Sequence, residues 1–313
     1  MEITHIPVLL AETVGYLNCQ AGGIYLDGTL GSGGHALKIL KDNPEIKALI
    51  AIDWDEVAIT STRKKLQSFS QKTFIFQDNF INIPAVLKEL KIKEVNGILL
   101  DLGVSSQHLD DQDRGFSFRL EGPLDMRMDR NLSTTAFDLV NTSSSSQLKQ
   151  IFFNYGEERF APRIARAIVN ERQKEPIADT LKLSELVTSA IPPKYRPRKI
   201  HPATKTFQAL RIAVNNELEN LREVIDASID LLAQGGRLCI ITFHSLEDRI
   251  VKHQFRTLSM GYSNAERFLP QKEVTSGKVK LITKKPVTPQ PEEIRKNPRA
   301  RSAKLRVIEK LYT

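Results

Sequence analysis

Three aspartates in the first part of the chain each follow a short apolar run, and their side chains could serve one binding site. Asp27, Asp53 and Asp101 come directly after runs of three to five apolar residues that predict buried strands. Ligands bind at the carboxyl ends of parallel strands in α/β proteins, so we expect the three carboxylates at that edge. Asp53 in particular can accept hydrogen bonds from ribose hydroxyls. The pattern indicates a nucleoside-containing cofactor.

A glycine-rich turn, residues 28–35, follows Asp27 without a gap. Glycine tolerates positive φ and lets a backbone approach a ligand with no Cβ between them. The helix expected to begin near Gly34 offers free N–H groups to a polar ligand. We therefore expect this turn, including Gly31, to cradle the cofactor beside Asp27.

Two cofactors fit the turn. Residues 31–36 match the G-x-G-x-x-G/A pattern of dinucleotide binding, which favours NAD. Asp27 argues the other way, because a carboxylate repels a pyrophosphate but attracts a sulfonium or an ammonium. Charge therefore favours S-adenosylmethionine (SAM). A turn without any ligand is the third alternative, although a turn that only reverses the chain does not need so many glycines.

The composition predicts a protein with a sizeable core. The chain has 313 residues, 41% of them hydrophobic, which suits one large domain or two smaller ones. Cys19 and Cys239 form no Cys-x-x-Cys motif, and no metal-ligand cluster is apparent. The chain begins with no leader-like segment, and no run approaches the ~20 apolar residues of a membrane span. We expect a cytoplasmic protein that uses neither a metal nor a membrane.

Positive charge is concentrated in two segments. The net charge is +8, and residues 272–313 alone hold 12 Lys/Arg against 4 Asp/Glu. A second cluster, residues 194–205, interleaves basic side chains with prolines and Tyr195. Localised positive charge beside an aromatic ring is typical of nucleic-acid binding, although a solvated basic surface is the alternative. The candidates for contact with a nucleic-acid backbone are Arg196, Arg198, Lys199, Lys205, Arg299 and Arg301.

The order of the expected elements separates two kinds of structure. Residues 24–100 alternate apolar runs with helical segments, which predicts a parallel α/β sheet. Residues 103–131 show no periodicity, yet their mixture of Phe, Arg and Asp favours an ordered, functional loop. Residues 133–205 predict short helices and no strand, which indicates an inserted helical domain. From residue 206 the α/β pattern resumes, with a long helical stretch made of residues 207–214 and then 218–232, and strands over 237–243 and 304–308.

Ten motifs occur in a fixed order along nearly the whole chain. They are HIPVLL (5–10), DGTLGSGGH (27–35), ID (52–53), DLGVSS (101–106), RGFSF (114–118), GPLDMRMD (122–129), YGEE (155–158), HPATKTFQ (201–208), FHSLEDR (243–249) and RARSAKLR (299–306). Together they resemble the MraW family of small-subunit ribosomal RNA methyltransferases. So many motifs in one order are far more specific than a glycine turn alone.

The resemblance implies a Rossmann-like, SAM-dependent methyltransferase sheet with a small all-helical domain inserted in it. The expected division is a first core part over 1–113, a helical substrate-recognition domain over 114–205, and a second core part with a basic C-terminal segment over 206–313. The implied activity is methylation of the exocyclic N4 of a cytidine in the decoding region of small-subunit (16S) ribosomal RNA. The cofactor positions that the resemblance implies are Gly33, Gly34, His35, Asp53, Phe80, Asp101 and His108.

Catalysis on a cytosine amine needs an acceptor near the methyl donor, because the amine lone pair is delocalised into the ring. Many amino-methyltransferases use an Asp/Asn/Ser-Pro-Pro-aromatic motif after the fourth strand, whereas this chain has residues 101–104, DLGV, there. We expect Asp101, or a backbone carbonyl just after it, to accept from the amine; the alternative is that Asp101 only holds the cofactor. His244 is a second catalytic candidate, and its alternative role is to cap the end of a strand.

The target base must leave its stack to reach the cofactor. Phe116 or Phe118 could stack on it, although both could equally be aromatic residues in the core of the loop. The substrate is expected to be the RNA in the assembled small subunit, and the chain could be a monomer or a homodimer. Two other functions stay open at this point: a nicotinamide oxidoreductase, and an RNA-binding assembly factor without activity.

Overall fold

The computed structural model describes residues 6–104, 109–260 and 277–312. The chain forms two compact units. The first, which we call the core unit, comprises Met1–Gly103 and Leu218–Thr313. The second, the helical unit, comprises Val104–Glu217. Among the described residues, every helix is too short or too polar to cross a membrane.

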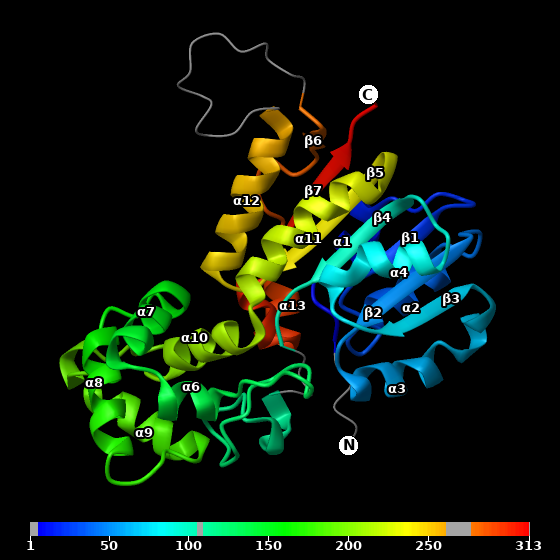
Figure 1. Ribbon diagram of the computed structural model, residues 1–313. Coiled ribbons are helices and arrows are strands. Elements are labelled where there is room, and N and C mark those ends of the chain that lie inside the picture. The colour runs from blue at the N-terminus through cyan, green and yellow to red at the C-terminus, as the bar shows by residue number, and fades with distance from the viewer. Residues whose placement is uncertain (1–5, 105–108, 261–276, 313) are drawn as a thin grey trace. The chain divides into compact units, whose positions relative to one another are not determined.

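A seven-stranded sheet forms the centre of the core unit, in the order β3-β2-β1-β4-β5-β7-β6 (Figure 1). The strands from β1 to β5 pair in parallel, and β7 pairs antiparallel with both β5 and β6. Every residue of β2 is buried, as expected for a parallel strand covered on both faces. The strands are β1 Ile24–Asp27, β2 Ala48–Asp53, β3 Thr73–Gln77, β4 Val95–Asp101, β5 Leu232–Thr242, β6 Val279–Leu281 and β7 Lys304–Lys310.

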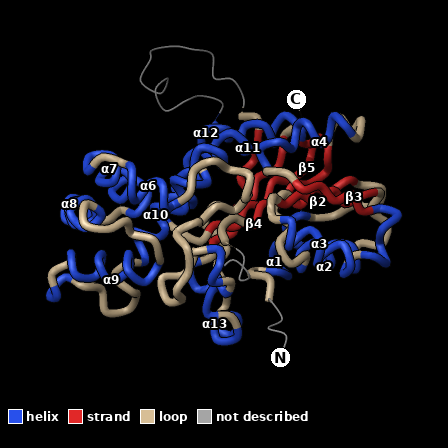
Figure 2. Tube along the Cα trace, turned by 60° about the horizontal axis from the view of Figure 1, so that its bottom comes forward, coloured by secondary structure: helices blue, strands red, loops and turns tan. Residues whose placement is uncertain are grey.

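Helices cover both faces of this sheet (Figure 2). Three helices pack on one face: α1 Leu10–Leu17, α2 Gly34–Asp42 and α3 Glu56–Lys65. Three others pack on the opposite face: α4 Ile83–Glu89, α11 Glu217–Leu231 and α12 Ser245–Met260. On α11 the buried residues Leu221, Val224 and Ile225 recur at the spacing of one helix face. The shorter elements of this unit are η1 Gln67–Lys72, η2 Phe80–Asn82, α13 Pro291–Lys296 and η6 Pro298–Ser302.

The strand order creates a switch point between β1 and β4. From β1 the chain continues to β2 and β3 on one side, and then crosses to β4 and β5 on the other. Connections that leave in opposite directions open a crevice at the carboxyl ends of the two central strands. Asp27 ends β1 and Asp101 ends β4, so both aspartates lie at this crevice.

The N-terminal segment, residues 6–9, is held against the glycine turn by the C-terminal part of the chain. The Leu9 N–H donates to Glu293 Oε1 of α13 at 2.7 Å, and Asn297 Nδ2 donates to the Ile6 carbonyl at 3.0 Å. Pro7 lies so close to Gly34 that a Cβ on that glycine would be 2.0 Å from Pro7 Cγ. The turn is therefore backed by residues from both ends of the chain.

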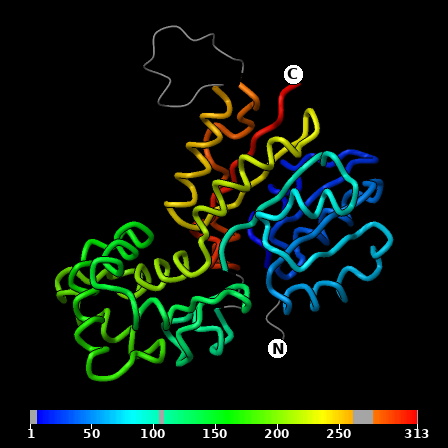
Figure 3. The backbone as a smooth tube through the Cα atoms, viewed as in Figure 1, coloured from blue at the N-terminus to red at the C-terminus, as the bar shows by residue number. Residues whose placement is uncertain are grey.

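The helical unit contains no strand among its described residues, and Figure 3 shows its helices grouped together. Capping boxes start two of the helices, at Thr135 with Asp138 and at Ser144 with Gln147. Gly156 allows a close helix contact, because a Cβ there would be 2.6 Å from the Lys205 carbonyl. The elements are η3 Gln112–Arg114, α6 Ala136–Thr142, α7 Ser145–Gly156, α8 Ala161–Arg172, α9 Thr180–Ala190, η4 Pro193–Tyr195 and α10 Thr204–Asn215.

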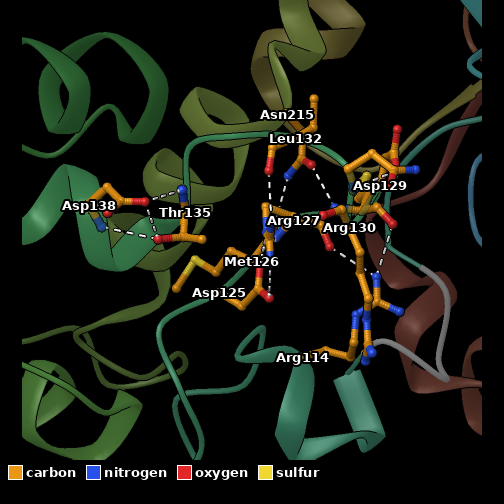
Figure 4. A network of polar contacts seen from close by, with 12 residues as sticks. Arg114, Asp125, Met126, Arg127, Asp129, Arg130, Leu132, Thr135, Asp138 and Asn215 are labelled. Carbon is orange, nitrogen blue, oxygen red and sulfur yellow. Dashed lines mark hydrogen bonds and ion pairs between the residues drawn. The ribbon is translucent and has the colours of Figure 1, made fainter.

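The loop that precedes α6 is ordered by a network of polar contacts (Figure 4). The buried Arg114 donates through Nη2 to the carbonyls of Arg127 and Met128, at 2.9 and 3.0 Å. Asn215 of α10 accepts from the Met128 N–H at 2.7 Å and donates to the Met126 carbonyl at 2.8 Å. Arg127 in turn pairs with Asp125 at 2.7 Å. Residues 114–128 thus have a fixed conformation, as the mixed composition of this part of the loop predicted.

The expected boundaries differ in part from those of the structure. The helical segments expected over 207–214 and 218–232 are α10 and α11, which are separated by Asn216 in a left-handed conformation (φ 52°). The helical unit includes residues 109–113 and 206–217, since α10 packs on α7. Helices α1, α12 and α13 and strand β6 were not predicted.

Candidate cofactor and active site

The glycine turn after β1 is held in shape by Asp53 at the end of β2. The Gly31 N–H donates to Asp53 Oδ2 at 2.7 Å, and the Asp55 N–H donates to Asp53 Oδ1 at 2.9 Å. Thr62 of α3 donates from Oγ1 to the Gly31 carbonyl at 2.9 Å. The sequence analysis assigned Asp53 to a ribose; the structure shows that this carboxylate also shapes the turn.

The glycines of the turn serve two different purposes. A Cβ on Gly33 would lie 2.4 Å from Thr62 Cγ2, and Gly34 meets Pro7 in the same way. These two glycines are therefore required by packing within the protein. Gly31 differs, because its φ is +48° and a Cβ there would have only the Thr29 carbonyl, at 3.9 Å, near it. The backbone at Gly31 faces open space, where a ligand can approach it.

Asp27 is buried beneath this turn with 1% of its surface exposed. Its Oδ1 accepts from the Thr29 N–H at 3.2 Å. Burial raises the pKa of the Asp27 carboxyl to about 7, the Asp53 carboxylate also raises it, and the hydrogen bond from Thr29 opposes both. At neutral pH this carboxyl is thus close to half ionised in the absence of a nearby cation.

Asp101 lies at the end of β4, on the other side of the switch point. Its N–H donates to Thr29 Oγ1 at 2.6 Å, which ties β4 to the turn. Its carboxylate oxygen Oδ1 is buried and has no hydrogen-bond partner within the described part of the chain. Burial raises the pKa of Asp101 well above the ordinary value, and the carboxylates of Asp27 and Glu247 raise it further. The Oδ1 atom of Asp101 is therefore a buried acceptor that lacks a partner among these residues.

His35 connects the N-terminal segment to Asp101. Its ring is buried, with Nε2 3.1 Å from the Val8 carbonyl and Nδ1 3.6 Å from Asp101 Oδ2. Phe80, another expected cofactor residue, follows β3 and lies 5.8 Å from the Trp54 ring, centroid to centroid. Trp54 directly follows Asp53, and the sequence analysis did not consider it. The expected cofactor residue His108 lies outside the described residues.

Glu247 is a buried acid that sequence reasoning also missed. Its Oε2 accepts from the N–H groups of Phe243 and His244, at 2.7 and 3.2 Å, at the start of α12. Its Oε1 lies 3.1 Å from His244 Nε2. The His244 side chain is only 12% exposed, so the catalytic candidate His244 is held against Glu247. Both the capping role and contact with a substrate remain compatible with this geometry.

A cationic ligand fits the acids around the switch point. The carboxylates of Asp27, Asp53 and Asp101 influence one another, and neither the Asp27 nor the Asp101 pKa is lowered by a lysine or an arginine. SAM carries a sulfonium and an ammonium, whereas the pyrophosphate of NAD would add negative charge. The orphaned Asp101 oxygen and the open backbone at Gly31 are thus suited to SAM. The residues that would hold it are Asp27, Gly31, Asp53, Phe80 and Asp101.

The expected RNA-contact residues are distributed over both units. In the helical unit, Arg198 and Lys199 are exposed, while Arg196 donates to the Ile191 carbonyl at 3.1 Å and Lys205 to the Glu157 carbonyl at 2.9 Å. Arg299 and Arg301 are exposed residues of η6 in the core unit.

The two expected stacking rings differ in exposure. Phe116 is buried, with 6% of its surface exposed, which suits the alternative role in the loop core. Phe118 is half-buried and stacks on His201, with the ring centroids 4.7 Å apart and an angle of 14° between the planes. His201 is thereby packed locally, and burial, then Arg119, lowers its pKa.

Comparison with known proteins agrees with this geometry. The sequence pattern of the MraW methylase family matches residues 2–311. The chain belongs to the MraW methylase family. Among curated relatives, the ribosomal RNA small subunit methyltransferase H of Halothermothrix orenii is 49% identical over 309 residues, 99% of each chain. The protein of the same name from Syntrophus aciditrophicus is 48% identical over 307 residues, 98% of each chain.

Two solved structures resemble this MraW chain at a distance. An rRNA methylase from Streptococcus thermophilus has a TM-score of 0.41 and 12% identity, covering 96% of this chain and 92% of that one. An O-methyltransferase from Thermotoga maritima has a TM-score of 0.42 and 10% identity, covering 100% and 69%. The assignment therefore depends on the sequence family. As an MraW methylase the chain uses SAM as its cofactor, and neither the oxidoreductase nor the inactive binding protein finds support.

Proposed function

We propose that this chain transfers a methyl group from SAM to the exocyclic N4 of a cytidine in the decoding region of small-subunit ribosomal RNA. The names of its curated relatives support the RNA and the reaction class, and the ten motifs support the finer target. The observation that carries the chemistry is the buried Asp101 oxygen at the switch point, which has no hydrogen-bond partner among the described residues.

The reaction asks three things of the protein. SAM, when bound, supplies an electrophilic methyl group on a positively charged sulfur. The protein must place the amine in line with that methyl, withdraw its lone pair from the ring, and accept a proton. Placement alone can supply much of the acceleration, because it removes the entropic cost of bringing two reactants together.

Asp101 can fulfil the second and third requirements. Its pKa is raised while the site holds only other acids, so a cation nearby is needed to ionise it fully. Once ionised, Oδ1 can accept a hydrogen bond from the target N–H, which localises the amine lone pair on nitrogen. The same carboxylate then takes the proton as the methyl is transferred, while a backbone carbonyl beyond it can accept a hydrogen bond from the amine but not its proton. The role of Asp101 would thus depend on a bound cation.

The helical unit is the proposed substrate-recognition part, and the assembled small subunit the proposed substrate. A decoding-region cytidine must be exposed before it can be turned out of its stack. Phe118 is the better candidate for stacking on that base, since Phe116 is buried.

The test is methyl transfer from isotope-labelled SAM to small ribosomal subunits that lack the modification, followed by mass spectrometry of the nucleosides. Free small-subunit RNA is assayed in parallel, and the Asp101→Ala protein controls for contaminating activity. Labelled N4-methylcytidine made on subunits would establish the reaction and the substrate state. Label in another nucleoside, or none at all with SAM binding confirmed, would contradict the proposal.

A further inference from the structure

The helical unit carries an exposed aromatic ring surrounded by cations, and none of the roles above requires it. Tyr195 ends η4 and is 49% exposed. Lys194 Nζ lies 4.8 Å from the centroid of its ring, and the Arg159 guanidinium lies 5.9 Å from it. The Phe160 ring is 5.6 Å from the Tyr195 ring and 5.7 Å from the same guanidinium. We call Arg159, Phe160, Lys194 and Tyr195 the aromatic platform.

The backbone under both rings is held rigidly. The Tyr195 N–H donates to the Pro192 carbonyl at 2.9 Å, and Pro193 fixes φ at the first position of η4. The Phe160 N–H donates to Oε1 of the buried Glu158 at 2.8 Å, and Pro162 opens α8 just beyond. A rigid, exposed ring loses little conformational entropy when a ligand binds to it, so it suits recognition.

The cations of the platform and of the loop beside it have no carboxylate partner among the described residues. Within the residues that the structure describes, Arg159, Lys194, Arg198 and Lys199 make no ion pair with a carboxylate. Residues 192–205 contain five Lys/Arg and no Asp/Glu. A structural role would pair these cations with acids, as Lys182 pairs with Glu171 at 2.9 Å elsewhere in the unit. The platform is instead complementary to a polyanion whose units carry flat rings.

We propose that the aromatic platform binds a single-stranded stretch of RNA, with one unpaired base stacked on Tyr195 and the flanking phosphates held by Arg159 and Lys194. Tyr195 offers the exposed ring, Phe160 supports it from the side, and the two cations replace counterions along the backbone. The proposal rests on the proposed function for the class of RNA. It adds a second nucleotide contact, distinct from the cytidine that is methylated.

Binding assays with an RNA oligonucleotide from the decoding region test the stacked base. Tyr195→Ala is expected to raise Kd roughly 5- to 100-fold, the loss of one stacked base, while Tyr195→Phe keeps the wild-type Kd. Phe153→Ala is the matched control: Phe153 is 62% exposed on α7 of the same unit and has no cation over its ring among the described residues. Tyr195→Ala should leave the slope of log K against log salt concentration unchanged. Lys194→Gln should make this slope shallower by the amount that one phosphate contact contributes.

Abasic substitutions identify the base. Each nucleotide of the oligonucleotide is replaced in turn by an abasic one. At one position this replacement should weaken binding to the wild-type protein and leave the Kd of Tyr195→Ala unchanged. Equal Kd values for Tyr195→Ala and wild type, or no abasic position whose effect depends on Tyr195, would overturn the stack and leave only a basic surface. Since Tyr195 is exposed, unchanged thermal unfolding of the variants verifies their fold.

Methyl transfer separates this proposal from the proposed function. With small subunits as substrate, Tyr195→Ala is expected to raise KM for the subunit and to leave kcat at the wild-type value, because the stacked base is not the one that accepts the methyl. If the wild type transfers no methyl, the proposed function has failed, whatever the oligonucleotide shows. If the wild type is active and Tyr195→Ala has an unchanged KM and Kd, the platform alone has failed.

Discussion

The two units place charge in opposite ways. In the core unit, the pKa values of Asp27 and Asp101 are raised, and no lysine or arginine of the described residues lowers them. In the helical unit, Lys194 and Arg198 are exposed cations that have no carboxylate partner within the described part of the chain. Buried charges of one sign are costly and respond strongly to a small ligand, whereas exposed charges cost little and respond to salt. The first arrangement suits a cationic cofactor, and the second suits a long polyanion.

The largest effect is expected from Asp101→Asn, which keeps the volume of the side chain but removes its charge and its basicity. We expect kcat at saturating SAM to fall about 10³-fold, in the range for loss of a positioned base. Asp42→Asn, an exposed change on α2 of the same unit, should have no effect on kcat. Wild-type turnover by Asp101→Asn would show that Asp101 serves only to hold the cofactor.

The second expected effect is on stability in the absence of SAM. The folded-state pKa of Asp27 is about 7, above the ordinary 3.8, so protonation favours the folded state. This contribution is complete below pH ~3.8 and is lost as the pH rises through 7, about 2.5 kcal/mol of it between pH 5 and pH 7. The unfolding free energy of Asp27→Asn should therefore fall less over this range, because its unfolding releases about one proton fewer than that of the wild type. Parallel pH profiles of urea unfolding for the variant and wild type would refute the buried, ionisable Asp27.

Proton release on SAM binding tests the ionisation of the same two carboxylates. A cation lowers the raised pKa values of Asp27 and Asp101, so binding releases protons and the affinity rises with pH. Kd should fall up to about tenfold per pH unit between pH 5.5 and 7 if one proton is released. Calorimetry in two buffers of different ionisation enthalpy measures the protons. S-adenosylhomocysteine, which lacks the sulfonium charge, should release fewer, and equal release would contradict the assignment of the charge.

The smallest expected effect concerns the basic loop beside the platform. Replacing Arg196, Arg198 and Lys199 together with Gln should weaken RNA binding roughly tenfold at 0.15 M salt. The slope of log K against log salt concentration should become shallower by two to three phosphate contacts, each worth about 0.7–0.9. The control replaces three exposed lysines of the core unit, Lys64, Lys88 and Lys93. An equal loss in the control would mean that only total charge matters, and the distinction between the two units would disappear.

Sequence alone was sufficient where local rules determine the structure. The strands that end at Asp27 and Asp101 were predicted because continuous apolar runs bounded by polar turns are typical of buried parallel strands. The short helices over 133–205 were predicted because that stretch has helical periodicity and no apolar run typical of a strand.

What the sequence could not predict depends on contacts between distant residues. Glu247 affects Asp101 only because β4 and β5 are neighbours in the sheet, and no spacing in the sequence shows this. Phe116 and Phe118 are two residues apart in a loop without periodicity, so nothing indicated that only the first would be buried.

The N-terminal segment has a consequence for the order of folding. Leu9 and Ile6 are held by Glu293 and Asn297, which lie 284 and 291 positions further along the chain. Contacts between residues so far apart in sequence form late, because each must first overcome the entropy of closing a long loop. The backing of the glycine turn, and with it the finished cofactor site, therefore depends on completion of the whole core unit.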